Sequence, residues 1–164
     1  MNFTWTAATG ADVADIVALA EQHFQTEIDS IFRPEPFAYN RNITFAVVNQ
    51  FYAPPAELLY ICRDQARLIA YTWAKANDRA AWSDDRMVVI RMAHVALDLS
   101  ARHRVRLIQD MLELWEHFAR LSNNPIICST TMRHSQDAFL RLHERAGYSV
   151  RGSYAYKRIE LSPS

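Results

Sequence analysis

The hydrophobic residues of segment 101–121 recur every three or four positions, which is the spacing of one face of an α-helix. The stripe consists of Ile108, Met111, Leu112, Trp115, Phe118 and Ala119. Polar and charged residues occupy the positions between them. Ser100 can cap the first turn, and Asn123-Asn124-Pro125 ends the segment. The pattern predicts one long amphipathic helix.

Three shorter segments also have helical patterns. Thr9 and Asp12 have the spacing of a capping box, which opens a first helix. The inward face of that helix is Val13, Ile16, Val17, Ala20 and Phe24. Segment 37–51, bounded by prolines, favours a second helix, although its β-branched and aromatic residues leave a strand open. Segment 135–146 is expected to be a short helix with Gly147 as its C-terminal cap.

The remaining apolar segments are typical of strands. They are 2–7, 58–63, 68–75, 87–97, 126–130 and 150–159, the last with a turn at 151–153. Segments 58–63 and 68–75, with Asp64-Gln65-Ala66 between them, suggest a hairpin. An apolar strand on either side of the long helix indicates a right-handed parallel crossover. We therefore expect strand 126–130 to be central, parallel to 87–97 and buried on both faces.

Composition limits the class of protein. The chain has 164 residues, half of them hydrophobic, and we expect a single domain spanning 1–164. Its 18 basic and 18 acidic side chains cancel, so no overall field attracts nucleic acid or an anionic membrane. No stretch reaches the roughly 18 apolar residues of a membrane helix, and no leader pattern is present. A cytoplasmic location is the expectation.

Several chemistries have no motif in this sequence. Cys62 and Cys128 each lie in an apolar run and are expected to be core thiols, not a disulfide or reactive cysteines. The six histidines form no His-x-x-x-His pair and there is no Cys-x-x-Cys, so no metal is expected. Gly-x-Ser-x-Gly and P-loop motifs are missing. The hydroxyl cluster Ser129-Thr130-Thr131 suits either a cleft or, by default, a cap for the next helix.

The order of elements is strand, two helices, three strands, long helix, buried strand, short helix and terminal strands. With Leu142-His143-Glu144-Arg145-Ala146-Gly147-Tyr148, this order resembles the GNAT superfamily of acyl-CoA N-acyltransferases. The resemblance implies a mixed α/β (α+β) fold. Its central sheet would be mostly antiparallel, with a parallel fourth and fifth strand pair and helices on both faces. It also implies transfer of an acetyl group from acetyl-CoA to a small-molecule or protein amine.

The resemblance places the cofactor phosphates at the start of segment 101–121. The family's loop reads Arg/Gln-x-x-Gly-x-Gly/Ala, whereas this chain has His103 and Val105 where the glycines belong. Side chains there crowd a pyrophosphate. Arg102 and Arg104 can contact the phosphates instead, or they are simply solvated on a surface helix. A backbone N–H near Val95 or Leu97 is expected to stabilise the oxyanion.

Two histidines are candidates for proton transfer. His143 occupies the position of the family's tyrosine, which the resemblance makes the acid that protonates the leaving thiolate; the alternative is a partly exposed helix residue. His94 is a candidate base, with Asp84 and Asp85 kept open. Asp98 is expected to be a turn or capping residue.

Two other functions remain open. The missing glycines favour a catalytically inactive GNAT-fold binding or structural protein. The wording Ile-Cys-Ser-Thr-Thr also resembles a phage-encoded branch of the superfamily, which makes a virion partner a second expectation. Nucleic-acid binding is the weakest reading, because only Arg102 and Arg106 of the three nearby arginines share a helix face. The aromatic segment 37–52 is either core or the interface of a homo-oligomer.

Overall fold

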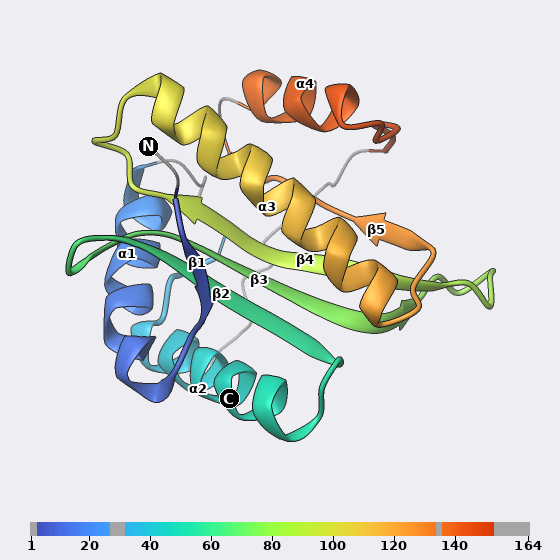
Figure 1. The fold of residues 1–164 in the computed structure, drawn as a ribbon, viewed down its shortest axis with the longest axis horizontal. Helices are drawn as coiled ribbons and strands as arrows, with labels where there is room; N and C mark the ends of the chain where they lie inside the picture. The colour runs from blue at the N-terminus through green and yellow to red at the C-terminus, as the bar shows by residue number, and fades with distance from the viewer. Residues whose placement is uncertain (1–2, 27–31, 134–135, 153–164) are drawn as a thin grey trace, which may run out of the picture.

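The computed structural model describes residues 3–26, 32–133 and 136–152 and consists of helices packed on a twisted sheet (Figure 1). The elements in chain order are β1 (Trp5–Ala7), the 3₁₀ turn η1 (Gly10–Asp12), α1 (Val13–Thr26), α2 (Pro36–Tyr52), β2 (Glu57–Asp64), β3 (Arg67–Arg79), β4 (Arg86–Val95), α3 (Ala101–Leu121), β5 (Ile126–Cys128) and α4 (Asp137–Arg145). This order agrees with the one that the sequence predicts up to the end of α4.

The described strands form one sheet in the order β1-β2-β3-β4-β5. All neighbours are antiparallel except β4 and β5, which are parallel. The predicted hairpin is confirmed as β2 and β3, which meet at the pair Asp64 and Arg67. Gln65 in its turn has a φ of 53°, a left-handed conformation that polar turn residues tolerate.

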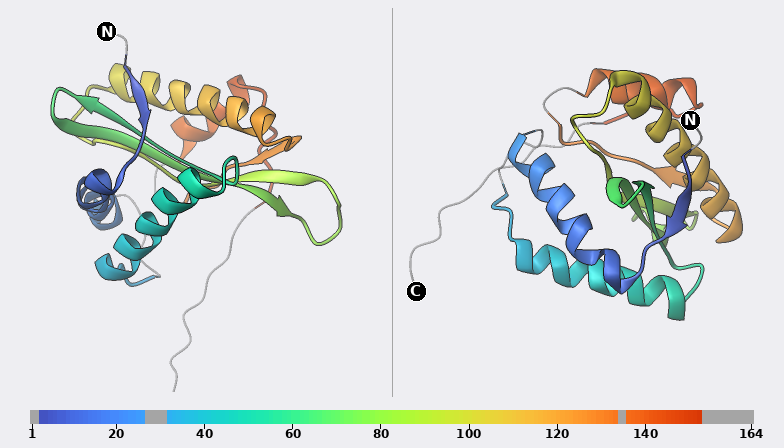
Figure 2. Two further views of the ribbon diagram at one scale, coloured as in Figure 1. Left: turned by 60° about the horizontal axis from the view of Figure 1, so that its bottom comes forward. Right: turned by 60° about the vertical axis from the view of Figure 1, so that its left-hand side comes forward.

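The sheet is covered on both faces, by α1 and α2 on one side and by α3 and α4 on the other (Figure 2). Alternation along β2 directs Leu58 and Cys62 into the core beneath α3, and Leu59 and Ile61 into the core beneath α1 and α2. The predicted stripe of α3 is confirmed, because all six of its residues are buried. Burial raises the pKa of the Cys62 thiol to about 11, as befits a core cysteine.

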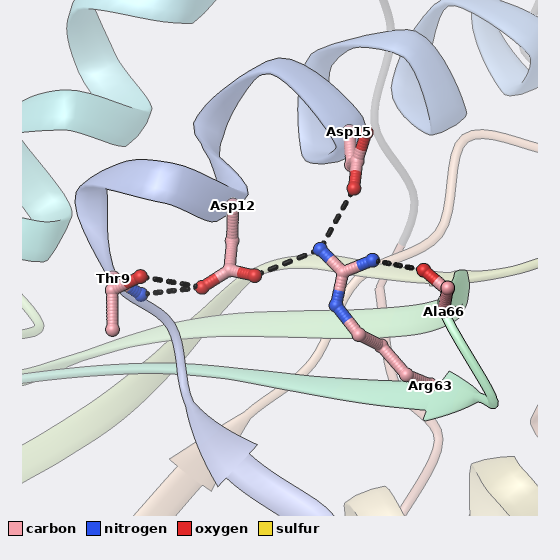
Figure 3. A network of polar contacts seen from close by, with 5 residues as sticks. All are labelled: Thr9, Asp12, Asp15, Arg63 and Ala66. Carbon is pink, nitrogen blue, oxygen red and sulfur yellow. Dashed lines mark hydrogen bonds and ion pairs between the residues drawn. The ribbon is translucent and has the colours of Figure 1, made fainter.

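The start of α1 is fastened to the β2–β3 hairpin by a polar network (Figure 3). The carboxylate of Asp12 accepts hydrogen bonds from the backbone N–H and the hydroxyl of Thr9, both at 2.8 Å. The guanidinium of Arg63 contacts Asp12 at 2.8 Å and Asp15 at 2.7 Å, and it donates to the carbonyl of Ala66 at 2.6 Å. The predicted pairing of Thr9 with Asp12 therefore also anchors the helix to the sheet.

The segment that follows is helical, so the strand alternative for 37–51 is wrong. Glu35 caps α2 by accepting the N–H of Ala38 at 2.9 Å, and Pro36 supplies a first-turn residue that needs no partner. Most of the aromatic side chains of α2 face outward; Phe37 is 75% and Tyr52 is 86% exposed. Only a narrow face of the helix therefore belongs to the core.

The prediction for strand 126–130 is correct in direction and wrong in burial. β5 is parallel to β4 but has only three residues, and Ile126 is 43% exposed. Among the described residues β5 is an edge strand, because no other described strand pairs with it. Val150 to Gly152 are not in a strand, and the rest of the predicted strand 150–159 lies outside the described residues.

Candidate functional site

The strands β4 and β5 pair only at their beginnings. The register joins Met87 with Ile126 and Val89 with Cys128, after which β4 continues to Val95 without β5 beside it. The β4 ladder to β3 is also irregular at Arg91, which the register skips, as in a β-bulge. The edge of β4 beyond Val89 is therefore open toward the segment that follows β5.

Side chains satisfy part of this open edge. The carbonyl of Ala93 accepts a hydrogen bond from the Arg133 guanidinium at 2.6 Å, and the carbonyl of Val95 accepts one from His23 Nε2 at 2.9 Å. On the other edge, the N–H of Ala96 donates to the carbonyl of Ile69 at 2.8 Å. Because backbone groups alternate along a strand, the N–H of Val95 is expected to face the open edge as well.

A cavity of about 310 Å³ lies at this split. Its walls are residues 90–94 of β4, residues 130–133 after β5, and side chains of α1, of the segment before α2 and of α4. A second cavity, of about 1020 Å³, lies against β5 and α4. The two share Thr130, Thr131, Met132, Arg133 and Phe139. The open end of the sheet thus has an adjoining cavity on each side of residues 130–133.

His94, a predicted base, lies in the wall of the smaller cavity and is 3% exposed. Its Nδ1 is 2.7 Å from the hydroxyl of Tyr71, which is 2.7 Å from the hydroxyl of Tyr39. The other face of the ring stacks on His23, with centroids 4.3 Å apart. α1, α2, β3 and β4 each contribute one member of this cluster.

The surroundings keep the His94 ring neutral. Burial, the neighbouring His23 ring and the Arg133 cation lower the pKa of His94 well below 6.5. Burial also raises the pKa of Tyr71 and of Tyr39, so both hydroxyls keep their protons at neutral pH. A neutral imidazole hydrogen-bonded to a neutral hydroxyl can accept a proton.

His143 is the second predicted histidine, and the alternative of a partly exposed residue is wrong, since it is 3% exposed. Its Nδ1 is 2.9 Å from the carbonyl of Phe139, and its Nε2 is 3.0 Å from the hydroxyl of Ser129. His143 and Ser129 both line the larger cavity. Burial lowers the pKa of His143.

The hydroxyl cluster 129–131 lines the cavities and does not cap the next helix. Ser129 belongs to the larger cavity, and Thr130 and Thr131 belong to both. The N-cap position of α4 is Gln136, whose side chain makes no capping hydrogen bond. The cleft interpretation is therefore confirmed over the capping one.

The start of α3 carries the residues predicted to bind phosphate. Ser100 caps the helix by accepting the N–H of His103 at 3.3 Å, and the His103 ring packs edge-on against Phe3. Arg102 is exposed, and Val105 is 41% exposed. Neither cavity is lined by residues of this turn.

Arg104 and Arg106, near the start of α3, differ in their partners. Arg106 forms an ion pair with Asp110 at 2.9 Å. The Nε atom of Arg104 is buried and has no hydrogen-bond partner among the described residues. Leu97 lies in the turn between β4 and α3, not in the strand.

The carboxylates kept open as bases are separated from the histidine cluster. Asp84 is exposed and lies 3.7 Å from Arg79, and Asp85 lines only the larger cavity. Asp98 pairs with Arg67 at 2.6 Å on the surface.

Within the described ranges, no cluster of three or more histidine, cysteine or acidic side chains is placed to hold a metal ion. No helix there is long and apolar enough to cross a membrane.

Sequence reasoning missed Tyr39, Tyr71, His23 and Arg133. These residues lie on separate elements, and no spacing along the chain connects them with His94. Arg133 lies two residues after the hydroxyl cluster, which is the only local signal that it borders the same cleft.

No protein-family model and no curated protein matches this chain. Solved structures match it over nearly its full length. A predicted acetyltransferase from Clostridium acetobutylicum, with acetyl-CoA, has a TM-score of 0.71 at 12% identity and covers 96% of each chain. An aminoglycoside N-acetyltransferase in complex with CoA has a TM-score of 0.69 at 11% identity, covering 98% of this chain and 96% of its own.

A transcriptional regulator from Bacillus halodurans has a TM-score of 0.70 at 14% identity, covering 96% of this chain and all of its own. These likenesses establish the architecture, since their identities are too low to carry an activity. The mostly antiparallel sheet of the described strands, with β4 and β5 as its parallel pair, agrees with that architecture. This chain is a divergent sequence with the GNAT fold, the fold of the acyl-CoA N-acyltransferases.

Proposed function

We propose that this protein transfers an acyl group, acetyl in the simplest case, from a CoA thioester to an amine. The observation that carries the proposal is the cavity at the split between β4 and β5, with the buried, neutral His94 in its wall. Structures of the same fold hold CoA or acetyl-CoA, which supports a thioester donor. The thioester supplies an activated acyl carbonyl.

The phosphates of the donor are assigned to the start of α3. The first-turn N–H groups and the positive end of the helix dipole favour an anion there. The buried Nε of Arg104, which has no partner among the described residues, is a donor that a phosphate oxygen would satisfy. Arg102, two residues earlier, is exposed. Because His103 and Val105 replace the glycines, we assign the contacts mainly to guanidinium groups.

We assign His94 as the base that removes a proton from the amine. An amine must lose a proton to become a nucleophile and again after attack, and a neutral imidazole can take one. We assign Nδ1–H of His94 as the donor to the oxygen of Tyr71, which leaves the lone pair of the ring on Nε2. Tyr71 in turn contacts Tyr39. The two hydroxyls would therefore stabilise the positive charge that develops on His94.

Two further groups complete the proposed site. The backbone N–H of Val95, on the open edge, or that of Leu97 would stabilise the oxyanion. His143, across residues 130–133, would return a proton to sulfur. That proton would come from the Ser129 hydroxyl, 3.0 Å from Nε2 of His143.

The test is thiol release from acetyl-CoA in the presence of a panel of primary amines, with acetylated product identified by mass spectrometry. We expect amine-dependent turnover, reduced at least about 100-fold in kcat by His94→Gln. His117→Gln, at an exposed histidine of α3, is the matched control and should leave kcat unchanged. Turnover in His94→Gln within a few-fold of wild type would exclude His94 as the base.

The side chains of His103 and Val105 at the glycine positions favour one alternative, a GNAT-fold binding or structural protein without turnover. That alternative predicts neither amine acetylation nor CoA binding at millimolar concentration. Such a result, from protein with a normal cooperative melting transition, would replace the acyltransferase proposal.

A further inference from the structure

The hydrogen bonds of His143 fix which of its nitrogens carries the proton. The carbonyl of Phe139 can only accept, so Nδ1 of His143, 2.9 Å away, must be the donor. In the neutral ring the lone pair is then on Nε2. The hydroxyl of Ser129, 3.0 Å from Nε2, donates to that lone pair. The pair is therefore arranged as hydroxyl donor and imidazole acceptor.

The ring is also held in place on several sides. The rings of Phe139, Tyr148 and Trp115 lie 4.3, 4.9 and 5.9 Å from that of His143, measured between centroids. Burial lowers the pKa of His143, so the neutral form dominates at neutral pH. In this form His143 has no proton to give at Nε2, and its Nδ1–H is committed to Phe139. A neutral His143 therefore cannot act directly as the acid for a thiolate.

Ser129 is placed to resolve this difficulty. It directly follows β5, at the point where β5 parts from β4, and it lines the larger cavity together with His143. A hydroxyl, a base within hydrogen-bond reach and a third group that orients the base are the arrangement of an activated nucleophile. Here the three groups are the Ser129 hydroxyl, the His143 ring and the Phe139 carbonyl.

We propose that Ser129 is a nucleophile that takes up the acyl group as an ester before the amine receives it, with His143 as its base. The donor class, an acyl thioester, rests on the function proposed above; the nucleophile itself does not. Ser129 Oγ attacks the acyl carbon while its proton passes to His143 Nε2. The carbon–sulfur bond then breaks, and the imidazolium gives that proton to the sulfur.

The second half of the reaction restores the enzyme. His94 takes the first proton from the ammonium group, and the free amine attacks the ester carbonyl. His143 Nε2 then takes the second proton from the attacking nitrogen, and the carbon–oxygen bond breaks. The same proton returns to Ser129 Oγ. No oxidant, reductant or further reactant is needed. Water in place of the amine would give the free acid by the same steps.

The test uses 4-nitrophenyl acetate, an activated ester that needs no CoA site. We expect acetylation on the peptide that contains Ser129, found by mass spectrometry after rapid acid quenching, with a matching burst of nitrophenol. Ser129→Ala should lose that adduct, whereas Thr44→Ala, at an exposed hydroxyl of α2 away from both cavities, should keep it. His143→Gln should slow adduct formation by about 100-fold or more.

A thiol at the same position gives a second variant that keeps the test decisive if Ser129→Ala folds poorly. Ser129→Cys should form an acetyl-cysteine adduct at position 129. An absent adduct in both the wild type and Ser129→Cys, with normal melting transitions, would overturn the proposal. So would amine turnover from acetyl-CoA that is unchanged in Ser129→Ala, because transfer would then be direct.

The two proposals fail in different ways. An adduct at Ser129 in a protein that does not bind CoA would uphold the nucleophile and reject the thioester donor. CoA binding and turnover without an adduct, and without loss in Ser129→Ala, would uphold the donor and reject the nucleophile.

Discussion

The imidazole rings of His23 and His94 lie nearly parallel, 11° apart, with their centroids separated by 4.3 Å, although one comes from α1 and the other from β4. Two cationic rings at that distance repel each other strongly in a buried environment. His23 donates through Nε2 to the carbonyl of Val95, and His94 contacts Tyr71. The stack therefore favours a neutral His94 beside the open edge of β4.

The first prediction concerns the hydroxyl that holds His94. Tyr71→Phe removes the group at Nδ1 and leaves the Tyr39 hydroxyl without that partner. We expect kcat to fall about 10-fold to 100-fold, a loss typical of removing an orienting partner, and the acid limb of the pH–rate profile to move. Stability should fall by about 1–3 kcal/mol. A merely structural tyrosine would lower the melting temperature without moving the pH profile.

The matched control is Tyr60→Phe on the adjacent strand β2, whose ring packs against the core beneath α3, on the opposite face of the sheet from Tyr71. It should change neither kcat nor the profile. Equal pH profiles for wild type and Tyr71→Phe would remove Tyr71 from the mechanism.

Part of this site was within reach of the sequence. Segment 101–121 and the hairpin could be predicted because a long helical stripe and two short β-rich runs are local patterns. His94 and His143 were found through the family resemblance, because His94 lies on the fourth strand and His143 takes the place of the family's tyrosine. Their partners were not, because Tyr39, Tyr71 and His94 come from three elements that only the folded sheet brings together.

The errors have physical causes too. An apolar run such as Ile126-Ile127-Cys128 looks the same at the centre and at the edge of a sheet, since only the neighbours decide its burial. The exposure of His143 could not be judged either. On α4, His143 packs against Trp115 of α3. The residue pattern of a helix as short as α4 does not show which neighbouring helix will cover it.

The second prediction follows from the lowered pKa of His94. An unfolded histidine takes up a proton near its ordinary pKa of 6.5, whereas folded His94 does so only at lower pH. The unfolded state therefore binds more protons below pH 6.5, and stability should decrease as the pH falls through that range toward the folded pKa. The melting temperature measured from pH 8 to about pH 5 should show this slope.

His94→Gln should flatten the slope, because it removes one of the groups that titrate differently in the two states. His143, whose pKa burial also lowers, should account for a further part. His117→Gln, at an exposed position, is the control and should leave the slope as it is. A wild-type slope retained in His94→Gln would contradict a depressed pKa at His94.

The third prediction contrasts the two ends of the crossover from α3 to β5. Met111, on the inward face of α3, is fully buried, whereas Ile126 of β5 is 43% exposed. Met111→Ala should lower the free energy of unfolding by about 2–5 kcal/mol, from lost burial and the cavity left behind. Ile126→Ala should cost less than about 1 kcal/mol. Urea denaturation of both variants measures the difference, and equal losses would place β5 in the interior of the sheet.

The central claim, that this GNAT fold still binds an acyl-CoA despite its missing glycines, is tested most directly by calorimetric titration with acetyl-CoA and with CoA. We predict micromolar binding to the wild type, weakened more than about 10-fold in the Arg102→Ala, Arg104→Ala double variant, a change of more than about 1.4 kcal/mol. Arg120→Ala, at the far end of α3, should bind as the wild type does. No heat of binding at millimolar CoA, or equal affinity in the wild type and the double variant, would contradict the account.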